Sequence, residues 1–202
     1  MSGINTNLLL EKKNLSTFEI TENFTCIRFL DQNKERFELE FNLEKGTSFN
    51  TFLIRSNEEL IIIHPPEKEN SKSINEIIST FFYQFKLKKI NIITGHINPK
   101  IIETIKTINT KFKDLTITCS NPGFKIISEL WNQKNPNSTN FIEVQLPLIN
   151  IIKKELNLEL DNTSLKLIPI PTARCPGGLI VYERNQELLL SEKIFSAHIA
   201  NE

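Results

Sequence analysis

The chain has 202 residues, of which 39% are hydrophobic and 24% charged, and its 24 basic residues balance its 24 acidic residues. This composition is typical of a globular protein with one sizeable core and excludes a low-complexity or disordered chain. Because the formal net charge is zero, no overall field attracts nucleic acid or an anionic membrane, and we expect no nucleic-acid partner.

Cysteine usage and the N-terminal residues bear on the compartment. Cys26, Cys119 and Cys175 lie far apart and are odd in number, which argues against a disulfide framework and a CxxC metal motif and indicates a reducing environment. The opening stretch MSGINTNLLLEKKNLST has an apolar run of only three leucines, too short for a signal peptide or a membrane span. We expect a cytoplasmic protein with a flexible arm over residues 1–20 and one domain over residues 21–202.

The first part of that domain is rich in β-forming residues. Segments 25–31, 36–43 and 48–56 are separated by the turn-forming stretches DQNKE and EKG, which predicts an antiparallel meander. From residue 60 the pattern changes to short apolar runs at 60–64, 90–94, 115–119 and 141–146, with helical patterns between them. Strands that alternate with helices predict βαβ units and a parallel sheet.

Three helices are predicted between these strands. The first covers residues 73–85, and Ser73 and Glu76 have the spacing of a capping box. The second begins at Asn98-Pro99 and the third at Asn121-Pro122, because Asn suits the N-cap and Pro the first helical position. Their apolar stripes are Ile74, Ile77, Ile78, Phe81, Phe82 and Phe85; Ile101, Ile102, Ile105, Ile108 and Phe112; and Phe124, Ile127, Leu130 and Trp131.

The remaining segments complete an α/β architecture. Residues 132–140 form a polar loop, residues 159–164 suit a turn, and residues 164–170, 178–183 and 187–191 resume β character. The whole pattern predicts two packed mixed sheets flanked by helices.

Candidate site residues follow from this architecture, because sites in open α/β folds collect where strands end and helices begin. The positions are His64, His96, the PTARCPGG loop (171–178) and Ser191-Glu192. A lone histidine is more often structural than a ligand. His64 can therefore be a strand-end residue, and His96 can simply precede a helix cap and hydrogen-bond to nearby backbone.

Six stretches together resemble a known family: NKERFELEF (33–41), GTSFNTFLI (46–54), GHINPK (95–100), CSNPG (119–123), ARCPGGLIVYE (173–183) and LLLSEKIFSAH (188–198). They resemble, in order and spacing, the metallo-β-lactamase-like domain of flavodiiron proteins, also called A-type or diflavin flavoproteins, in their cyanobacterial branch. The resemblance implies an αββα sandwich, here C-terminally incomplete. It also implies a di-iron site that reduces oxygen, with electrons from FMN and NAD(P)H bound by further domains, and head-to-tail oligomers.

The family's metal ligands can be placed on this chain one by one. The motif HxExDH falls on His96, Asn98, Lys100 and Ile101, so the first histidine alone is kept. The next histidine falls on Arg174 and the bridging aspartate on Glu192, while the last would lie beyond residue 202. In one cyanobacterial subgroup of the family the pattern is similarly basic and poor in ligands, with the same HPP that follows the strand here at His64.

These substitutions predict a degenerate site. Iron sites of this kind need several carboxylates and imidazoles, and two cations stand in their place. At about 4 Å each like-charge contact costs on the order of 1 kcal/mol in water and several in a less polar site. We expect no di-iron centre and no FMN or NAD(P)H on this chain, and a salt bridge from Glu192 to Arg174, to Lys100 or to both.

Three functional hypotheses remain open from the sequence. The first is a flavodiiron-type domain related to electron transfer from NAD(P)H to oxygen, with its own iron site degenerate. The second is a non-catalytic subunit that forms a homo- or hetero-oligomer with a complete flavodiiron paralogue. The third and weakest is a metal-dependent hydrolase, which would need the HxHxDH ligand set to generate metal hydroxide.

Overall fold

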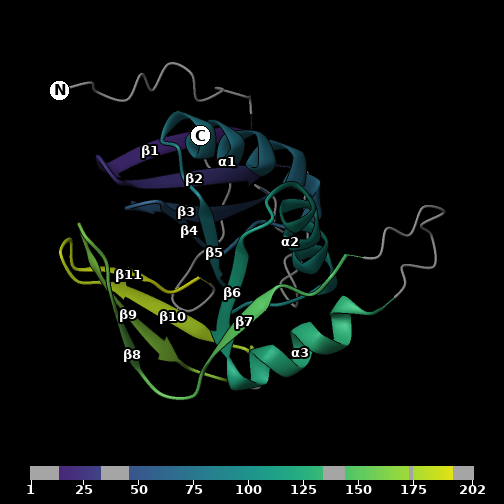
Figure 1. The fold of residues 1–202 in the computed structure, drawn as a ribbon. Helices are drawn as coiled ribbons and strands as arrows, with labels where there is room; N and C mark the ends of the chain where they lie inside the picture. The colour runs from purple at the N-terminus through teal and green to yellow at the C-terminus, as the bar shows by residue number, and fades with distance from the viewer. Residues whose placement is uncertain (1–13, 33–45, 134–143, 173–174, 193–202) are drawn as a thin grey trace.

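A computed structural model describes residues 14–32, 46–133, 144–172 and 175–192, which form two β-sheets and three α-helices (Figure 1). One sheet has the strand order β1-β2-β3-β4-β5-β6-β7, and the other β11-β10-β9-β8. The strands are β1 (Leu15–Thr21), β2 (Phe24–Asp31), β3 (Thr47–Ser56), β4 (Glu59–Ile63), β5 (Lys89–Ile93), β6 (Leu115–Ser120), β7 (Leu148–Ile152), β8 (Leu156–Glu159), β9 (Ser164–Pro169), β10 (Leu179–Glu183) and β11 (Leu188–Leu190). The helices are α1 (Ser71–Gln84), α2 (Pro99–Lys111) and α3 (Asn121–Trp131), and a 3₁₀ turn, η2 (Lys68–Asn70), precedes α1.

The large sheet is antiparallel from β1 to β4 and parallel from β4 to β7. The change of direction follows from the connections, because short turns join β1 to β2 and β3 to β4, whereas α1, α2 and α3 carry the chain back between successive parallel strands. The βαβ units predicted from the alternating pattern are confirmed. Parallel strands of this kind end at the same edge of the sheet, so the residues after β4, β5 and β6 lie near one another.

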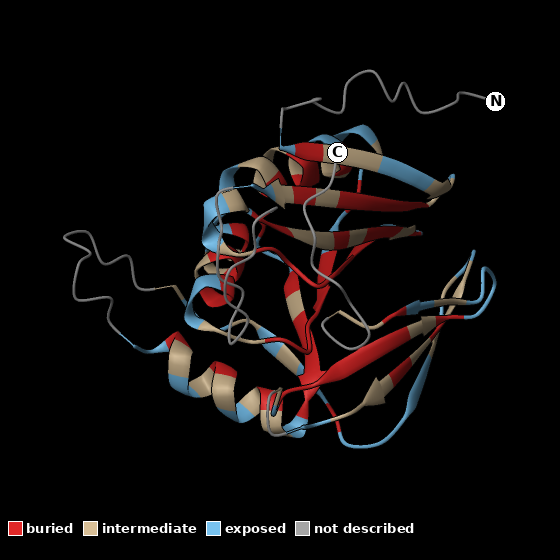
Figure 2. Cartoon of the chain, turned by 180° about the vertical axis from the view of Figure 1, so that it is seen from behind, coloured by how far each residue is buried: buried red, intermediate tan, exposed pale blue. Residues whose placement is uncertain are grey.

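Two apolar layers hold the sandwich together, as the buried residues in Figure 2 show. One lies between the large sheet and the three helices, where Leu60 and Ile62 of β4 meet the buried stripes of α1 and α2. The other lies between the two sheets, where Ile61 and Ile63 of β4 meet the small sheet. Full burial of such a side chain stabilises the fold by about 1.5–3 kcal/mol, and these four are fully buried.

The small sheet differs from the sequence prediction, because every strand pair in β8 to β11 is antiparallel rather than mixed. The predicted strands at 164–170, 178–183 and 187–191 are confirmed as β9, β10 and β11. All three described α-helices lie on the outer face of the large sheet (Figure 1). Within the described ranges no helix has the length and apolarity that a membrane span requires.

Several predicted element boundaries are wrong. The flexible arm was expected to extend to residue 20, but Leu15–Thr21 form β1, which pairs with β2. Residues 144–146 of the predicted strand 141–146 are not in a strand, and β7 begins instead at Leu148. The predicted strand 36–43 and residues 141–143 lie outside the described residues. Within the described residues β2 pairs with β3, with Phe24 opposite Ile54.

The N-cap predicted for α2 is confirmed, and those predicted for α1 and α3 are corrected. Asn98 is the N-cap of α2, as predicted, and accepts the Ile101 backbone N–H at 2.9 Å. At α3 the cap is Ser120 rather than Asn121, because the Ser120 hydroxyl accepts the Gly123 N–H at 3.2 Å. The capping box predicted at Ser73 is wrong, since α1 begins two residues earlier and has no side-chain cap.

Close packing of glycine backbones joins the two sheets near the ends of β5 and β6. A β-carbon built on Gly95 would lie 2.4 Å from the backbone nitrogen of Leu179, at the start of β10. A β-carbon built on Gly177 would lie 2.9 Å from the carbonyl oxygen of Gly95. Both positions therefore need glycine for this close approach rather than for an unusual backbone angle.

Gly95→Ala should lower the free energy of unfolding by about 1–3 kcal/mol, the usual cost of overpacking, because its methyl group would meet rigid backbone. Gly123→Ala is the matched control. Its nearest neighbour is the terminal methyl of Ile97 at 3.0 Å, which can move, so the loss should be smaller. Urea unfolding of both variants measures the difference, and equal losses would show that backbone contact at Gly95 is not the constraint.

Candidate functional site

The candidate site lies at the edge where the parallel strands end. His64 follows β4, His96 lies three residues after β5, and Glu192 follows β11 of the other sheet. The side chains of His64 and Glu192 are 1% and 6% exposed, and His96 is 8% exposed. The topology thus brings three of the four predicted positions to one end of the sandwich, with the loop before β10 beside them.

His96 is tied to the start of α2 through Asn98. The Asn98 side-chain oxygen caps the helix, so its Nδ2 group faces the other way and lies 3.1 Å from Nε2 of His96. An amide nitrogen can only donate, so Nε2 is the acceptor and a neutral His96 carries its proton on Nδ1. The same Nδ2 donates to Oε1 of Glu67 at 3.0 Å. One amide therefore satisfies a helix end, an imidazole and a carboxylate.

Lys100 turns toward two carboxylates from the segment that follows β4. Its Nζ lies 2.6 Å from Oε1 of Glu69 and 3.6 Å from Oε2 of Glu67. The hydrogen bond to Glu69 raises the pKa of Lys100, so the lysine stays charged. Lys100 was one of the two predicted partners of Glu192, beside Arg174. The ion pairs that the structure shows for Lys100 are with Glu67 and Glu69. Ile101, at the family's second histidine position, is buried in the core between α2 and the large sheet.

His64 and Glu192 form a buried contact between the two sheets. Nε2 of His64 lies 3.3 Å from the Leu190 carbonyl, which can only accept, so the proton is on Nε2. Nδ1 of His64 then faces Oε2 of Glu192 at 3.6 Å. Both residues have positive φ angles, 58° and 55°, a conformation that is uncommon without glycine and is found often at functional sites.

Two effects on the charge of His64 oppose one another. Complete burial lowers its pKa to about 4, although the hydrogen bond to Leu190 raises it somewhat. The Glu192 carboxylate favours the protonated ring, but its distance exceeds that of a hydrogen bond. Burial therefore decides, and His64 is neutral at pH 7. His64 and His96 are thus held as opposite tautomers by acceptor and donor groups of the chain itself.

The loop before β10 closes the site from the side of the small sheet. Sγ of Cys175 donates to the Gly95 carbonyl at 3.6 Å, and the Ser120 hydroxyl donates to the Gly177 carbonyl at 2.8 Å. Arg174 lies outside the described residues, so its predicted contact with Glu192 stays a prediction.

Burial raises the pKa of Cys26 to about 11 and of Cys119 to about 12, which keeps these two thiols protonated.

Sequence reasoning missed Glu67 and Glu69. Both stand in the PPEKEN segment directly after His64, and this position next to a candidate strand-end histidine was the available signal. In the part of the chain that the structure describes, no group of three or more His, Cys, Asp or Glu residues is placed to hold a metal ion. The described residues at this end of the fold offer hydrogen bonds and ion pairs.

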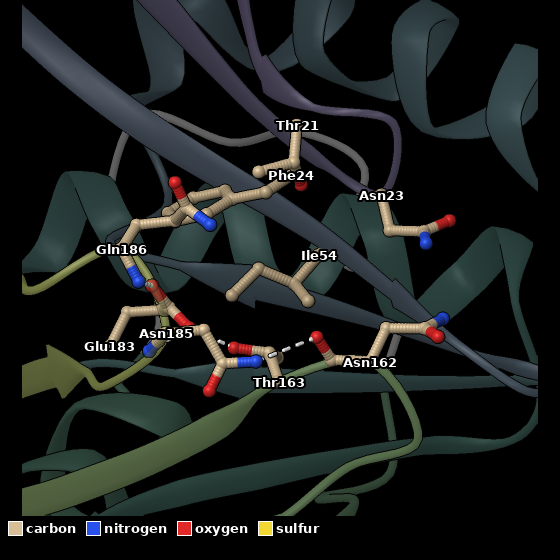
Figure 3. Close-up of a pocket in the computed structure, with 9 residues that line it drawn as sticks. All are labelled: Thr21, Asn23, Phe24, Ile54, Asn162, Thr163, Glu183, Asn185 and Gln186. Atoms are coloured by element: carbon tan, nitrogen blue, oxygen red, sulfur yellow. Dashed lines mark hydrogen bonds between the residues drawn. The ribbon is translucent and has the colours of Figure 1, made fainter.

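A small pocket lies at the opposite end of the sandwich from the candidate site, where the turns between strands meet (Figure 3). Its buried carboxylate, Glu183, accepts the Thr163 hydroxyl and the backbone N–H groups of Asn185 and Gln186. Asn185 in turn donates to the Asn162 carbonyl at 3.1 Å. These bonds close the turn between β10 and β11 onto the turn between β8 and β9, which is a structural role.

Comparison with known families places the fold. Residues 47–202 match the family model described as ODP family beta lactamase. The chain is 30% identical over 192 residues to putative diflavin flavoprotein A 6 of a Nostoc species and 26% identical over 197 residues to putative diflavin flavoprotein A 3 of a Synechocystis species. These matches cover 94% and 96% of this chain but 31% of each relative, so the chain spans under a third of their length.

Solved structures agree with the sequence matches. The metal-soaked Flv1 flavodiiron core from Synechocystis is 27% identical with a TM-score of 0.78, and the match covers 94% of this chain and 44% of that one. A fragment of diflavin flavoprotein A 5 from Nostoc is 28% identical with a TM-score of 0.76, covering 94% and 70%. The expected metallo-β-lactamase-like sandwich is thus confirmed.

Asn98→Ala should lower the free energy of unfolding by about 1 kcal/mol through loss of the helix cap. The variant should also let the His96 ring sample both tautomers, because its Nε2 loses the amide donor. Asn98→Ser is the matched control, since a serine hydroxyl can restore the cap without reaching His96. Denaturant unfolding and ¹⁵N chemical shifts of the ring measure the two effects. An unchanged His96 tautomer in both variants would contradict the assigned bridge.

The depressed pKa of His64 should make stability fall as the pH is lowered. The unfolded imidazole titrates near its ordinary value of 6.5 and the folded one near 4, so between these values the unfolded state binds more protons. Stability from this group is complete above pH 6.5 and declines towards pH 4, by on the order of 3 kcal/mol in all. His64→Gln keeps a donor for Leu190, and its unfolding free energy should vary less with pH over this range. Parallel profiles would exclude a neutral buried His64.

Proposed function

This chain belongs to the ODP family of beta-lactamase-like proteins and resembles the metallo-β-lactamase-like domain of flavodiiron proteins, and we propose that it serves an electron-transfer system from NAD(P)H to oxygen. In this proposal the chain does not assemble a di-iron centre of its own. The resemblance to cyanobacterial flavodiiron proteins implies FMN and NAD(P)H as well as iron. In this proposal those cofactors are bound elsewhere in the system. The chain itself supplies the fold and a closed, metal-free site.

The observation that carries the proposal is the occupation of Nε2 of His96 by the Asn98 amide at 3.1 Å. A metal needs the lone pair of an imidazole nitrogen, and here that lone pair already accepts a hydrogen bond. If Asn98 moved to free this lone pair, the cap of α2 would also be disturbed, because the side-chain oxygen of the same amide accepts the Ile101 N–H. The one histidine that the HxExDH positions keep is thereby committed to the protein.

Charge at the next ligand position points the same way. Lys100 stands where the family has an aspartate, and its ammonium group is held by Glu69 and Glu67. An ammonium group has no lone pair for a metal, and its positive charge replaces the attraction that a carboxylate would supply. Ile101 offers no ligand atom at all. The residues present do not fit a pair of iron ions.

Glu192 has a different cationic partner in this proposal. Lys100 has carboxylates of its own, so Arg174 is the proposed cationic partner of Glu192, with His64 on the other side of the carboxylate at 3.6 Å. An arginine suits such a role because its fork of donors matches two carboxylate oxygens. The cluster keeps the emptied pocket satisfied rather than adding net stability, because desolvation opposes buried ion pairs.

A non-catalytic role is the second candidate, favoured by the closure of the site through hydrogen bonds made within this chain. In that role the chain would form a homo- or hetero-oligomer with a flavodiiron paralogue that carries the complete ligand set. The protonated, buried Cys26 and Cys119 fit a reducing compartment, which supports a cytoplasmic location. A hydrolase is disfavoured, because it too would need the ligands that Asn98, Lys100 and Ile101 replace.

Metal analysis tests the proposal. The chain, purified without oxygen and incubated with ferrous iron, should retain far less than one iron per molecule after desalting. The matched variant Asn98→Glu/Lys100→Asp/Ile101→His restores the motif and should retain measurably more iron. Elemental analysis gives the ratio, and thermal unfolding shows whether the variant remains folded. Two irons bound by the unsubstituted chain would overturn the proposal.

A further inference from the structure

A basic patch lies at the end of the large sheet opposite the candidate site, where the chain enters β5 and β6. Two short stretches, FKLKKI (85–90) and KFKDL (111–115), carry five exposed lysines: Lys86, Lys88, Lys89, Lys111 and Lys113. Because β5 pairs in parallel with β6, with Ile90 opposite Leu115, the two stretches lie side by side. The whole chain has no net charge, so this concentration of positive charge is local.

Aromatic rings join the two stretches. The Phe82 ring of α1 packs against Phe112 of the second stretch, with ring centroids 4.8 Å apart. Tyr83 lies edge-on to Phe82, with centroids 6.0 Å apart, and is 70% exposed. Tyrosine is enriched at protein interfaces because its ring offers apolar area and its hydroxyl offers a hydrogen bond. The basic patch therefore has an exposed aromatic contact beside its charges.

The positive charge of the patch is only partly neutralised. Lys88 forms an ion pair with Glu58, whereas the other four lysines make no salt bridge within the described part of the chain. Burial raises the pKa of Glu59, the charge of Lys89 lowers it and that of Asp114 raises it, so these three groups lie within electrostatic reach of one another. Three carboxylates thus stand among five lysines, and an excess of positive charge remains.

Lys86 occupies a position where glycine is the usual residue. The helix α1 ends at Gln84, and Lys86 follows the C-cap with a φ angle of 52°. Its N–H donates to the Tyr83 carbonyl and the Leu87 N–H donates to the Phe82 carbonyl, which is the pattern that closes a helix through one left-handed residue. Glycine adopts this conformation more easily than lysine. A change to glycine would therefore remove the charge and keep the helix end.

We propose that the basic patch docks an acidic protein surface, in which several carboxylates surround an apolar or aromatic group. The carboxylates pair with the exposed lysines, and the apolar group packs on Tyr83. A folded protein can place its carboxylates beside the lysines and away from Glu58, Glu59 and Asp114, because like charges set opposite one another oppose binding. Nucleic acids and anionic membranes present closely spaced negative charges, which these three acids repel. The mixed charge pattern thus favours a protein partner.

This docking surface is independent of the proposed loss of iron. The patch precedes the parallel strands, whereas His96 follows them, so the two regions lie at opposite ends of β5. Exposed charges of this kind speed the encounter of two proteins and are screened by salt. Binding through the patch should therefore weaken as the ionic strength rises, whether or not the chain holds a metal.

Fluorescence anisotropy with a labelled peptide, rich in glutamate and with one tryptophan, measures the binding. The unsubstituted chain should bind this peptide at low salt and should not bind the same peptide with glutamine at every glutamate position. Lys86→Gly/Lys113→Gln should weaken binding by about tenfold, because each exposed ion pair contributes about threefold. Lys72→Gln/Lys125→Gln is the matched control, since both lysines are exposed on α1 and α3 outside the patch. The control should bind as the unsubstituted chain does.

Stability and competing anions keep the test decisive. Lys86→Gly alone should weaken binding and be at least as stable to heat as the unsubstituted chain, because glycine suits a φ angle of 52°. Single-stranded DNA and phosphatidylserine vesicles serve as alternative probes under the same conditions. Tighter binding of either one than of the glutamate peptide would overturn the proposal. So would a failure to bind that peptide at low salt, or equal weakening by the patch and control variants.

Discussion

The double burial of the parallel strands β4 and β5 is the constraint on which the rest of the molecule depends. From Leu60 to Ile63, alternate residues of β4 meet the helices on one face and the small sheet on the other, so a polar substitution there would disrupt one of the two cores. Asn91 of β5 is a buried polar residue within a strand, and it accepts the Thr118 hydroxyl. The other polar residues of these two strands lie at the strand ends, where the backbone leaves the sheet. His64 and His96 stand at those ends for this reason, whatever chemistry they perform. The fold thus gathers polar side chains at this edge, whatever ligand they bind.

That separation of core and site explains how ligand residues can change while the fold persists. The contacts that hold the sandwich together are apolar and lie within the layers, whereas Asn98, Lys100 and Glu67 lie at the margin. There each polar residue has a local partner: Asn98 caps a helix and Lys100 is held by carboxylates. A substitution that satisfies its own hydrogen bonds costs the fold little. Residues at this margin can therefore change without leaving a buried charge unpaired.

Features that follow from the local spacing of apolar residues could be predicted from the sequence. Features that depend on which elements lie side by side in the fold could not. Strands β4, β5 and β6 and the starts of α2 and α3 could be found because apolar runs, Asn-Pro pairs and helical stripes are local signals. β1 was missed because LSTFEIT is half polar and its apolar residues gain a partner only when β2 lies beside it. β7 was misplaced because VQL and LINII are similar apolar runs on either side of a proline. The partners of Lys100 could not be predicted, because Glu67 and Glu69 are distant from it in the sequence. Glu69, which makes the shorter contact, lies 31 residues before Lys100.

The described residues distribute polar and apolar groups unevenly. At the edge where the parallel strands end, Asn98 and Lys100 have partners within this chain, while Nδ1 of His64 is buried without a hydrogen-bond partner. The outer edge of β7 is different, because Leu148 and Ile151 are exposed there. A polar group that is satisfied internally has little to gain from a partner, whereas apolar area gains on the order of 25 cal/mol for each Å² removed from water. Removal of apolar area from water can therefore stabilise the edge at β7 more than it can the strand ends at Asn98 and Lys100.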